Sequence, residues 1–252
     1  MILPERDVAS LRVATYNVHG CVGLDRRRSE ARIAEVIATL SADLVALQEL
    51  DAGRTRSAGV DQARLIAEQL GWQCLFAPAM RNGDEQYGNA ILSRSSLSWT
   101  RALELPGKGS WYCREKRVAI WAAAETKIGR VHLINTHLGL GRAERFLQAQ
   151  YLGESLAALE ADEPFLLLGD FNSLPGSRSL GVIGNHLRSV RALLPAAGWC
   201  RTFPTRFPSV AVDHIFVNAI LEPTNLSVHR TPVSRVASDH YPLVAELVRK
   251  CR

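Results

Sequence analysis

A carboxylate and a carboxamide stand two residues apart in the stretch Gly169-Asp170-Phe171-Asn172. Side chains of these types at one point of the chain can face a single pocket and orient a water molecule or a polar, charged substrate. The same stretch is also typical of a turn in which the Asp side chain accepts backbone hydrogen bonds. Taken alone, it leaves catalysis and turn formation equally open.

Other polar side chains stand where apolar runs of the sequence begin or end. Each has an ordinary explanation, because an Asp or Asn beside a strand often caps a turn and a buried His often completes a hydrogen bond. Their recurrence at strand edges favours one shared site at which strand ends converge. The candidates are Asn17, Glu49, Asn89, His137, Asp213, Asp239 and His240.

Short apolar or β-branched runs predict the strands that carry these residues. The run from Phe165 to Leu168 is unbroken and bounded by Pro164 and Gly169, which fits a strand buried on both faces. Such a strand needs two covering layers. Further strands are expected at 11–18, 43–49, 72–76, 87–93, 116–124, 130–137, 212–217, 226–230 and 243–248.

Three amphipathic stretches predict helices that lie against the sheets. Ser29 is placed as the N-cap of the first and Asp61 as that of the second, which Gly71 should end. The third spans 142–160, and its first turn carries Arg142 and Arg145, whose charges oppose the helix dipole. A bound anion would explain these two arginines, and so would ordinary solvated surface positions.

The chain has 252 residues, of which 47% are hydrophobic, without a linker, a short repeat or a polar low-complexity stretch. This predicts one domain over residues 1–252. The N-terminal stretch lacks an apolar core and no apolar run is long enough for a bilayer, so we expect a cytoplasmic monomer without stable membrane insertion. Five scattered cysteines indicate neither a disulfide scaffold nor a zinc site.

The formal net charge is +5, and only four of the 30 basic residues are lysines. Arginine favours bidentate contacts with phosphate, so the composition suits a polyanionic partner. A coding bias toward arginine would produce the same count. Net charge alone therefore speaks for association with an anion and not for a defined site.

Seven short pieces in order resemble the motif series of the endonuclease/exonuclease/phosphatase superfamily, and the match spans residues 11–247. The resemblance implies an α/β fold, a four-layer α/β sandwich in which two mixed β-sheets pack face to face with helices outside. It also implies a divalent-metal phosphoesterase site at one end. The pieces are Tyr16-Asn-Val-His-Gly, Leu47-Gln-Glu, Gly88-Asn-Ala-Ile-Leu-Ser, Asn135-Thr-His-Leu, Gly169-Asp-Phe-Asn, Val212-Asp-His-Ile-Phe-Val and Ser238-Asp-His-Tyr-Pro.

The resemblance assigns a metal site, for which Mg²⁺ or Mn²⁺ is the expected ion. Glu49 matches the family's main metal ligand, with Asn17 beside it and Asp239 nearby. Mg²⁺ typically takes one or two carboxylates and keeps several waters, which this set allows. Phosphate-ester hydrolysis gains from such an ion because it neutralises charge on the phosphate.

The resemblance also assigns the groups that act on water and on phosphate. Asp170 matches the residue that orients or deprotonates the attacking water, and Asn172 matches its transition-state partner. Asp213 and His240 match a pair in which the carboxylate holds the imidazole and favours its charged form, so that a protonated His240 would bind the phosphate.

Three further positions bear on the subclass. His137 is similar to a histidine that pancreatic-type deoxyribonucleases and neutral sphingomyelinases use near the leaving group, where abasic-site endonucleases have a tyrosine. His19 departs from the acidic residue that repair enzymes carry, which argues against a second metal ligand there. Arg117 resembles a phosphate-contacting arginine of nuclease relatives, and Asn89 is expected to contact substrate as well.

The implied activity is a divalent-metal-dependent hydrolase that cleaves phosphodiester bonds, with nucleic acid as one candidate substrate. An alternative is a phosphodiesterase or phosphatase that acts on a phospholipid head group or a small phosphorylated molecule. A catalytically inactive binding module is disfavoured, because all of the expected catalytic side chains are present. Substrate choice would depend on four loops, at 52–60, 80–86, 106–115 and 195–209.

Overall fold

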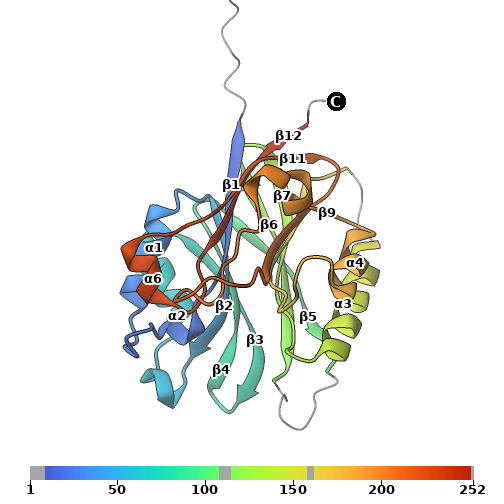
Figure 1. The fold of residues 1–252 in the computed structure, drawn as a ribbon. Coiled ribbons are helices and arrows are strands. Elements are labelled where there is room, and N and C mark those ends of the chain that lie inside the picture. The colour runs from blue at the N-terminus through green and yellow to red at the C-terminus, as the bar shows by residue number, and fades with distance from the viewer. Residues whose placement is uncertain (1–8, 108–114, 158–161, 251–252) are drawn as a thin grey trace, which may run out of the picture.

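Two mixed six-stranded β-sheets face each other at the centre of the molecule (Figure 1). The structure is a computed structural model that describes residues 9–107, 115–157 and 162–250. The first sheet has the order β11 (Leu221–Val228), β12 (Leu243–Arg249), β1 (Ser10–Asn17), β2 (Leu44–Ala52), β4 (Glu85–Ser93) and β3 (Gln73–Asn82). The second has the order β5 (Leu97–Leu105), β6 (Arg117–Thr126), β7 (Gly129–His137), β8 (Phe165–Asp170), β10 (Asp213–Val217) and β9 (Arg188–Ser189).

Neighbouring strands are antiparallel except for β1 with β2 in the first sheet and β7 with β8 in the second. A parallel pair needs a crossover connection. Helix α1 (Glu30–Thr39) supplies the first crossover and helix α3 (Arg142–Ala157) the second. A hydrogen bond between Asn17, the last residue of β1, and Asp170, the last of β8, shows that the carboxyl ends of both units meet.

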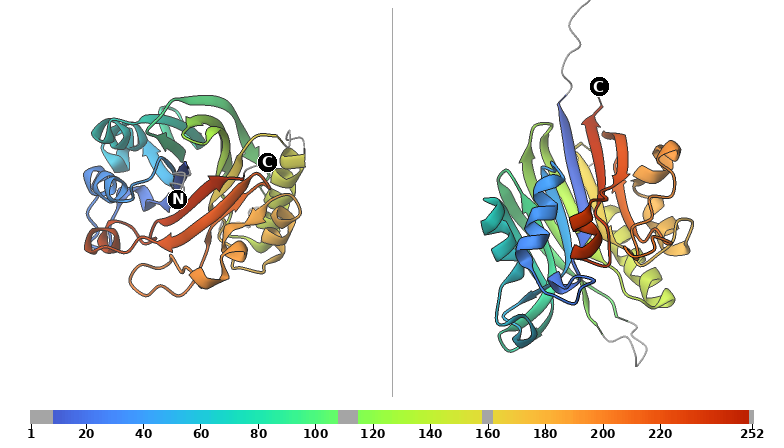
Figure 2. Two further views of the ribbon diagram at one scale, coloured as in Figure 1. Left: turned by 90° about the horizontal axis from the view of Figure 1, so that it is seen from above. Right: turned by 60° about the vertical axis from the view of Figure 1, so that its left-hand side comes forward.

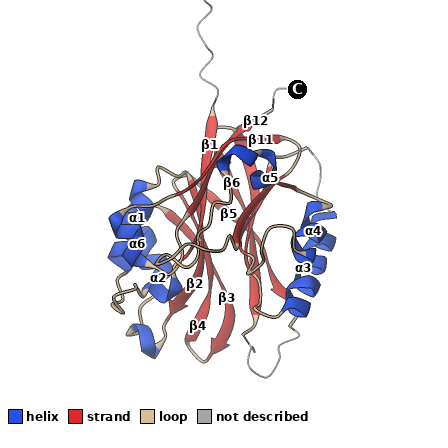
Figure 3. Cartoon of the chain, viewed as in Figure 1, coloured by secondary structure: helices blue, strands red, loops and turns tan. Residues whose placement is uncertain are grey.

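Helices form the two outer layers (Figures 1 and 3). Helices α2 (Gln62–Leu70) and α6 (Pro232–Ala237) lie with α1 outside the first sheet, and α4 (Arg178–Gly184) lies with α3 outside the second. The views in Figure 2 show the same arrangement from above and from the side. A single turn, α5 (Val190–Leu193), precedes the loop that leads to β10. The predicted four-layer α/β sandwich is confirmed.

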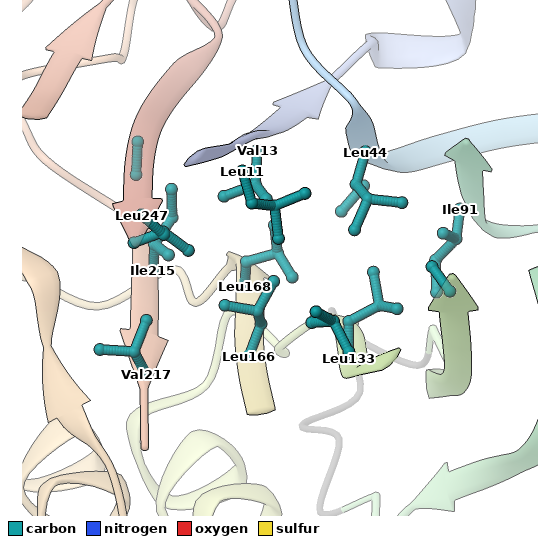
Figure 4. Close-up of a cluster of buried hydrophobic side chains, with 14 of the residues drawn as sticks. Leu11, Val13, Leu44, Ile91, Leu133, Leu166, Leu168, Ile215, Val217 and Leu247 are labelled. Carbon is teal, nitrogen blue, oxygen red and sulfur yellow. The ribbon is translucent and has the colours of Figure 1, made fainter. Parts of the chain in front are cut away.

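The largest hydrophobic cluster fills the space between the two sheets (Figure 4). Leu44 of the first sheet lies in the same cluster as Leu133 and Leu168 of the second. Two further clusters lie between the sheets and their helices, one for each sheet. Strand β8 takes part in both kinds of contact, since Leu168 packs between the sheets and Leu167 packs toward α3 and α4. Burial of this strand on both faces is therefore confirmed.

Helix caps follow the sequence signals. The side chain of Ser29 accepts a hydrogen bond from the backbone N–H of Arg32 at the start of α1, and Asp61 does the same with Arg64 at the start of α2. Gly71 ends α2 with a φ of 68°, in the left-handed region that glycine tolerates best. These contacts satisfy backbone groups that a helix end leaves unpaired.

Several predicted boundaries are wrong. Residues 80–86 form no loop, because β3 and β4 continue into a tight turn at Gly83-Asp84. Strand β11 begins at Leu221 and not at 226. The sequence patterns also missed β5, α4 and α6. Helix α3 is described to Ala157; the rest of its predicted range and residues 108–114 of the predicted 106–115 loop lie outside the described residues.

Among the described residues, no helix combines the length and the apolar character that crossing a bilayer requires.

Asn135 of β7 connects the two sheets at the level of the site. Its amide nitrogen donates to the carbonyl oxygens of Leu47 and Ala90, both at 2.8 Å, and its amide oxygen accepts from Gln48 Nε2 at 2.8 Å. All of these groups are buried. Substitution of Asn135 by leucine would leave them unpaired within the core.

We expect Asn135→Leu to lower the free energy of unfolding by roughly 2–4 kcal/mol, because each unpaired buried polar group costs about 1–3 kcal/mol. Urea unfolding followed by circular dichroism measures the change. The matched control is Asn185→Leu at an exposed position, where we expect a change within about 0.5 kcal/mol. Equal stability of the two variants would show that the inter-sheet bonds contribute nothing.

Candidate active site

Three neighbouring strands bring polar residues to one row at the edge of the second sheet. Asp170 at the end of β8 pairs in register with His137 of the parallel β7 and with Asp213 of the antiparallel β10. All three side chains are at least 95% buried. Strand pairing therefore places two carboxyl groups and an imidazole side by side, as the positions of these residues at strand edges predicted.

His240, in the loop before β12, lies between the two carboxyl groups of this row. Its Nδ1 atom is 2.9 Å from Oδ2 of Asp213, and its Nε2 atom is 3.7 Å from Oδ2 of Asp170. Burial alone would lower the pKa of His240, but the charge and hydrogen bond of Asp213, together with the charges of Asp170 and Asp239, raise it to about 10. The ring is thus an imidazolium at neutral pH.

Asp170 is held in a position suited to accepting a proton. Its Oδ1 accepts a hydrogen bond from the backbone N–H of Asn172 at 2.8 Å. Burial raises the pKa of its carboxyl to about 7, although the neighbouring charge of His240 opposes the rise. A carboxyl that titrates near neutral pH is a suitable general base, because it is deprotonated in part and still has a useful affinity for a proton.

Glu49 lies within β2, on a β-bulge, and not at the strand end that the sequence suggested. The register with β4 shifts between Leu47 and Leu50, and Glu49 itself has a φ of 63°. Such a conformation is uncommon for a residue with a side chain and concentrates at functional sites. The bulge interrupts the alternation of the strand and turns the Glu49 carboxylate toward Asp170, the opposite sheet's candidate base.

Asn17 joins the carboxylates of the two sheets. Its amide nitrogen donates to Oε1 of Glu49 at 2.9 Å and to Oδ2 of Asp170 at 3.1 Å. Its amide oxygen accepts from the backbone N–H of His19 at 3.0 Å, which fixes the orientation of the amide. In this arrangement Asn17 offers N–H groups, and not its oxygen, to the centre of the site.

His137 is neutral in this site. Burial, and then the charges of Arg117 and His240, hold its pKa well below 6.5. Arg117 donates to Nδ1 at 3.1 Å, so the ring proton resides on Nε2. That nitrogen faces Oδ2 of Asp170 at 3.6 Å. The amide nitrogen of Asn172, 3.1 Å away, is itself a donor and forms no hydrogen bond with this tautomer; it donates to the carbonyl oxygen of Leu138 at 2.9 Å. His137 therefore presents an N–H group to the centre of the site.

The remaining predicted residues lie at different depths around this centre. Asp239 is partly exposed, and its Oδ1 is 3.8 Å from Nδ1 of His19. Arg117 is buried, and its Nη2 pairs with Glu115 at 2.9 Å. Asn89 lies in the middle of β4, where its amide nitrogen donates to the carbonyl oxygen of Val118 at 2.9 Å. The contacts that Asn89 and Arg117 make with substrate remain predictions.

Sequence reasoning missed two residues that hold the Asp213–His240 pair. The hydroxyl of Thr202 donates to Oδ2 of Asp213 at 2.5 Å. The hydroxyl of Ser238 donates to the carbonyl oxygen of Asn17 at 2.8 Å and accepts from the backbone N–H of His240. Ser238 could have been found from its place next to Asp239-His240, whereas nothing in the sequence around Thr202 distinguishes it from an ordinary loop residue.

Asp170, Asp213 and His240 each bring one potential ligand atom within 4.8 Å of the others, so this cluster could hold a metal ion. An imidazolium has no free lone pair, however, and a metal there would have to displace the proton that Asp213 stabilises. The carboxylates of Glu49 and Asp239 carry no such restriction. Carboxylate oxygens are the ligand type that suits a hard divalent cation.

His214, the neighbour of Asp213 on β10, makes the free energy of unfolding depend on pH. Its Nε2 donates to the carbonyl oxygen of Ser173 at 2.8 Å, and burial lowers its pKa to about 4. In the unfolded chain the pKa of this histidine is about 6.5. Between pH 6.5 and about pH 4 the unfolded chain therefore binds a proton at His214 that the folded protein does not bind. This contribution to stability is complete above about pH 6.5 and is lost as the pH falls toward about 4, at about 1.4 kcal/mol per unit.

We therefore expect His214→Gln to reduce the slope of unfolding free energy against pH by about 1.4 kcal/mol per unit between pH 6 and 4.5. Urea unfolding at a series of pH values measures it. The exposed His186 provides the control, since His186→Gln should leave the slope unchanged. A wild-type slope in His214→Gln would contradict the assignment.

Comparison with known proteins gives a consistent result. A profile of the Endonuclease/Exonuclease/phosphatase family matches residues 14–240. The chain is 30% identical over 259 residues to the uncharacterized protein YbhP of Escherichia coli strain K12. The aligned region covers 94% of this chain and 96% of that protein.

Solved structures share the fold at lower identity. A mannosyl-6-phosphatase from Bacteroides thetaiotaomicron has a TM-score of 0.72 at 22% identity, over 94% of this chain and 99% of its own. The catalytic domain of human Nocturnin, with a bound sulfate anion, has a TM-score of 0.74 at 22% identity, over 96% of this chain and 95% of its own. The family profile covers most of the chain, and the chain therefore belongs to the endonuclease/exonuclease/phosphatase family.

Proposed function

We propose that this protein is a divalent-metal-dependent hydrolase of phosphodiester bonds. The observation that carries the proposal is the position of His240 between Asp213 at 2.9 Å and Asp170 at 3.7 Å. A buried imidazolium beside a carboxyl of raised pKa supplies a cation for phosphate and a base for water in one place. Members of this family are phosphoesterase hydrolases, and the comparison supports the reaction class.

Side chains of this protein account for the removal of a proton from water and for the hydrogen bonds to the reacting phosphate. Asp170 accepts the proton of the attacking water. Protonated His240 and the amide of Asn172 donate hydrogen bonds to the phosphoryl oxygens, where negative charge grows in the transition state. The Nε2–H group of neutral His137 donates a hydrogen bond to the oxygen that leaves and keeps its own proton; that oxygen takes its proton from solvent. Arg117, which fixes that tautomer through Nδ1, acts as a positioning residue for His137.

Glu49 and Asp239 would hold the metal ion, for which we expect Mg²⁺ or Mn²⁺. The fit rests on the donor set, which consists of carboxylate oxygens with partly exposed side chains. When bound, such an ion supplies positive charge that polarises the phosphate. Asn17, predicted from sequence to lie with the metal ligands, would instead serve this site by holding Glu49 in place through its N–H group.

A phosphodiester is preferred over a phosphomonoester, and nucleic acid and a small or lipid diester are both retained as candidate substrates. The excess of arginine favours nucleic acid. The mannosyl-6-phosphatase among the solved structures favours the alternative, a small phosphorylated molecule.

A binding module without activity is disfavoured because Glu49, Asp170 and His240 meet in one site. A cytoplasmic monomer remains a prediction.

A substrate panel at two ionic strengths tests the proposal. Supercoiled DNA, RNA, phospholipids, inositol phosphates and nucleotide diesters are assayed with Mg²⁺. An enzyme that engages several phosphates of duplex DNA should lose affinity with a log–log salt slope of about −0.9 per phosphate neutralised, whereas a small-diester enzyme should respond weakly. If DNA and RNA stay intact at low salt while a small diester turns over, the nuclease assignment is wrong.

A further inference from the structure

A cavity of about 660 Å³ opens beside the candidate active site, between α3 and α4. Asn172, whose amide nitrogen is 3.1 Å from Nε2 of His137, is one of its lining residues. Asn172 therefore borders both the cavity and the candidate active site. Its other lining residues include Arg142, Arg145, Phe146, Leu174, Ser177 and Arg178.

Three arginines of this wall lack an acidic partner within the part of the chain that the structure describes. Arg142 and Arg178 are exposed, and neither forms a salt bridge with a described carboxylate. Arg145 is half-buried and donates to the carbonyl oxygens of Gly139 and Leu140. Glu144, the acidic residue in the first turn of α3, is buried.

The position of these arginines is costly without an anion. Arg142 and Arg145 stand in the first turn of α3, where the helix dipole disfavours positive charge. Burial lowers the pKa of Arg145, and the charge of Arg142 acts in the same direction, while the charges of Glu144 and Asp170 oppose it.

The cavity also has an apolar component. The guanidinium of Arg178 lies over the ring of Phe146, 4.1 Å from the ring centroid. This contact orients the guanidinium plane without consuming its N–H donors. Leu174, on the loop between Asn172 and α4, is 51% exposed at the same wall. The wall thus combines oriented cationic donors with apolar side chains.

We propose that this cavity, with Arg142, Arg145 and Arg178, binds a second phosphate group of the substrate, and that the adjoining Phe146 and Leu174 contact the moiety that connects the two phosphates. The inference rests on the proposed phosphodiester hydrolysis and extends it. It identifies the substrate as one that carries two phosphates, either neighbouring phosphates of a nucleic acid strand or the two phosphates of a small molecule.

Two matched chromogenic compounds test the inference: thymidine 5′-(4-nitrophenyl phosphate) and the same compound with an additional 3′-phosphate. We expect kcat/KM to be at least about tenfold higher for the second, since a charge-assisted contact contributes about 1.5–3 kcal/mol and tenfold corresponds to about 1.4 kcal/mol. Arg142→Gln and Arg178→Gln should each reduce this preference about tenfold, and Arg142→Lys should retain most of it.

The matched control is Arg130→Gln, at the opposite end of β7 from His137, which should leave the preference unchanged. Calorimetric binding of thymidine 3′,5′-bisphosphate and of thymidine 5′-monophosphate, without metal, gives a second readout that needs no turnover. The same variants should abolish the difference in affinity between these two nucleotides. The inference is overturned if the wild-type protein has nearly equal kcat/KM values for the two chromogenic compounds. It is also overturned if the Arg142 and Arg178 variants keep the wild-type preference for the compound with the additional 3′-phosphate.

The two proposals fail in different ways. If neither chromogenic compound is hydrolysed while the bisphosphate still binds more tightly through Arg142 and Arg178, the second-phosphate site stands and diester hydrolysis is wrong. If both compounds are hydrolysed equally, hydrolysis stands and the second-phosphate site is wrong. Short oligothymidylates distinguish a nucleic acid strand from a small molecule as the source of the two phosphates. If they show the gain from a second phosphate as the small bisphosphate does, the substrate is a strand.

Discussion

Replacement of His240 by alanine should lower kcat/KM by roughly two to four orders of magnitude, and replacement of Asp213 by asparagine should have a similar effect, as is typical of groups that stabilise a transition state. The reason is that Asp213 is the main group that stabilises the charge of the buried His240, with further contributions from Asp170 and Asp239. Without the carboxylate, burial favours the neutral ring, and the phosphate loses its imidazolium partner.

The double variant shows whether the two residues act as a unit. Because each substitution removes the same interaction, the loss of transition-state free energy in the double variant should be clearly smaller than the sum of the two single losses. Steady-state kinetics on bis-4-nitrophenyl phosphate with Mg²⁺ measures all four proteins, and the exposed His186→Ala serves as control. Additive losses would mean that the pair does not act together.

Removal of divalent metal should abolish hydrolysis, and Mg²⁺ or Mn²⁺ should restore it. Glu49→Gln should reduce the restored rate by at least about a thousandfold, because it removes the carboxylate that we assign as the main ligand. The bulge of β2 supports the assignment, since it turns this side chain out of the alternation of the strand at the cost of an uncommon backbone conformation.

Two measurements check the metal prediction. Exhaustive treatment with EDTA followed by add-back tests the requirement itself, and calorimetric titration with Mg²⁺ tests the ligand, since Glu49→Gln should weaken binding. Glu104→Gln, at an exposed position of β5, is the matched control. Full turnover after EDTA treatment, or a Glu49→Gln variant with wild-type rate and metal affinity, would falsify the assignment.

The layers of the fold could be predicted from sequence because burial leaves a local pattern. The run 165–168 is apolar at every position since both of its faces are covered, and Ser29 and Asp61 signal helix starts because they bond to backbone groups a few residues away. Strand β5 has no such pattern, as it lies at the sheet edge with most of its side chains exposed. Helix α4 is short and contains two glycines, so it shows no helical period.

The site could be predicted in part. Asp170, Asp213 and His137 stand at strand edges, and the pairing of three strands brings them together as a direct result of the register. The bulge at Glu49 leaves no local signal, since it depends on how β2 pairs with β4 and on the bonds that Asn135 supplies from the other sheet. Thr202 escaped prediction for a similar reason: its partner Asp213 is near only in the folded chain.

The position of β1 in the first sheet determines when during synthesis the site can exist. One neighbour of β1 is β2, and the other is β12, so that Ser10 pairs with Val248 at opposite ends of the chain. As the ribosome releases the chain in order, β1 and β2 emerge early, but one edge of β1 keeps its hydrogen-bonding groups unpaired until β12 arrives. His240 immediately precedes β12 and arrives with it. The nascent chain therefore cannot complete the candidate site before β12 is made, and until then one edge of β1 stays unpaired.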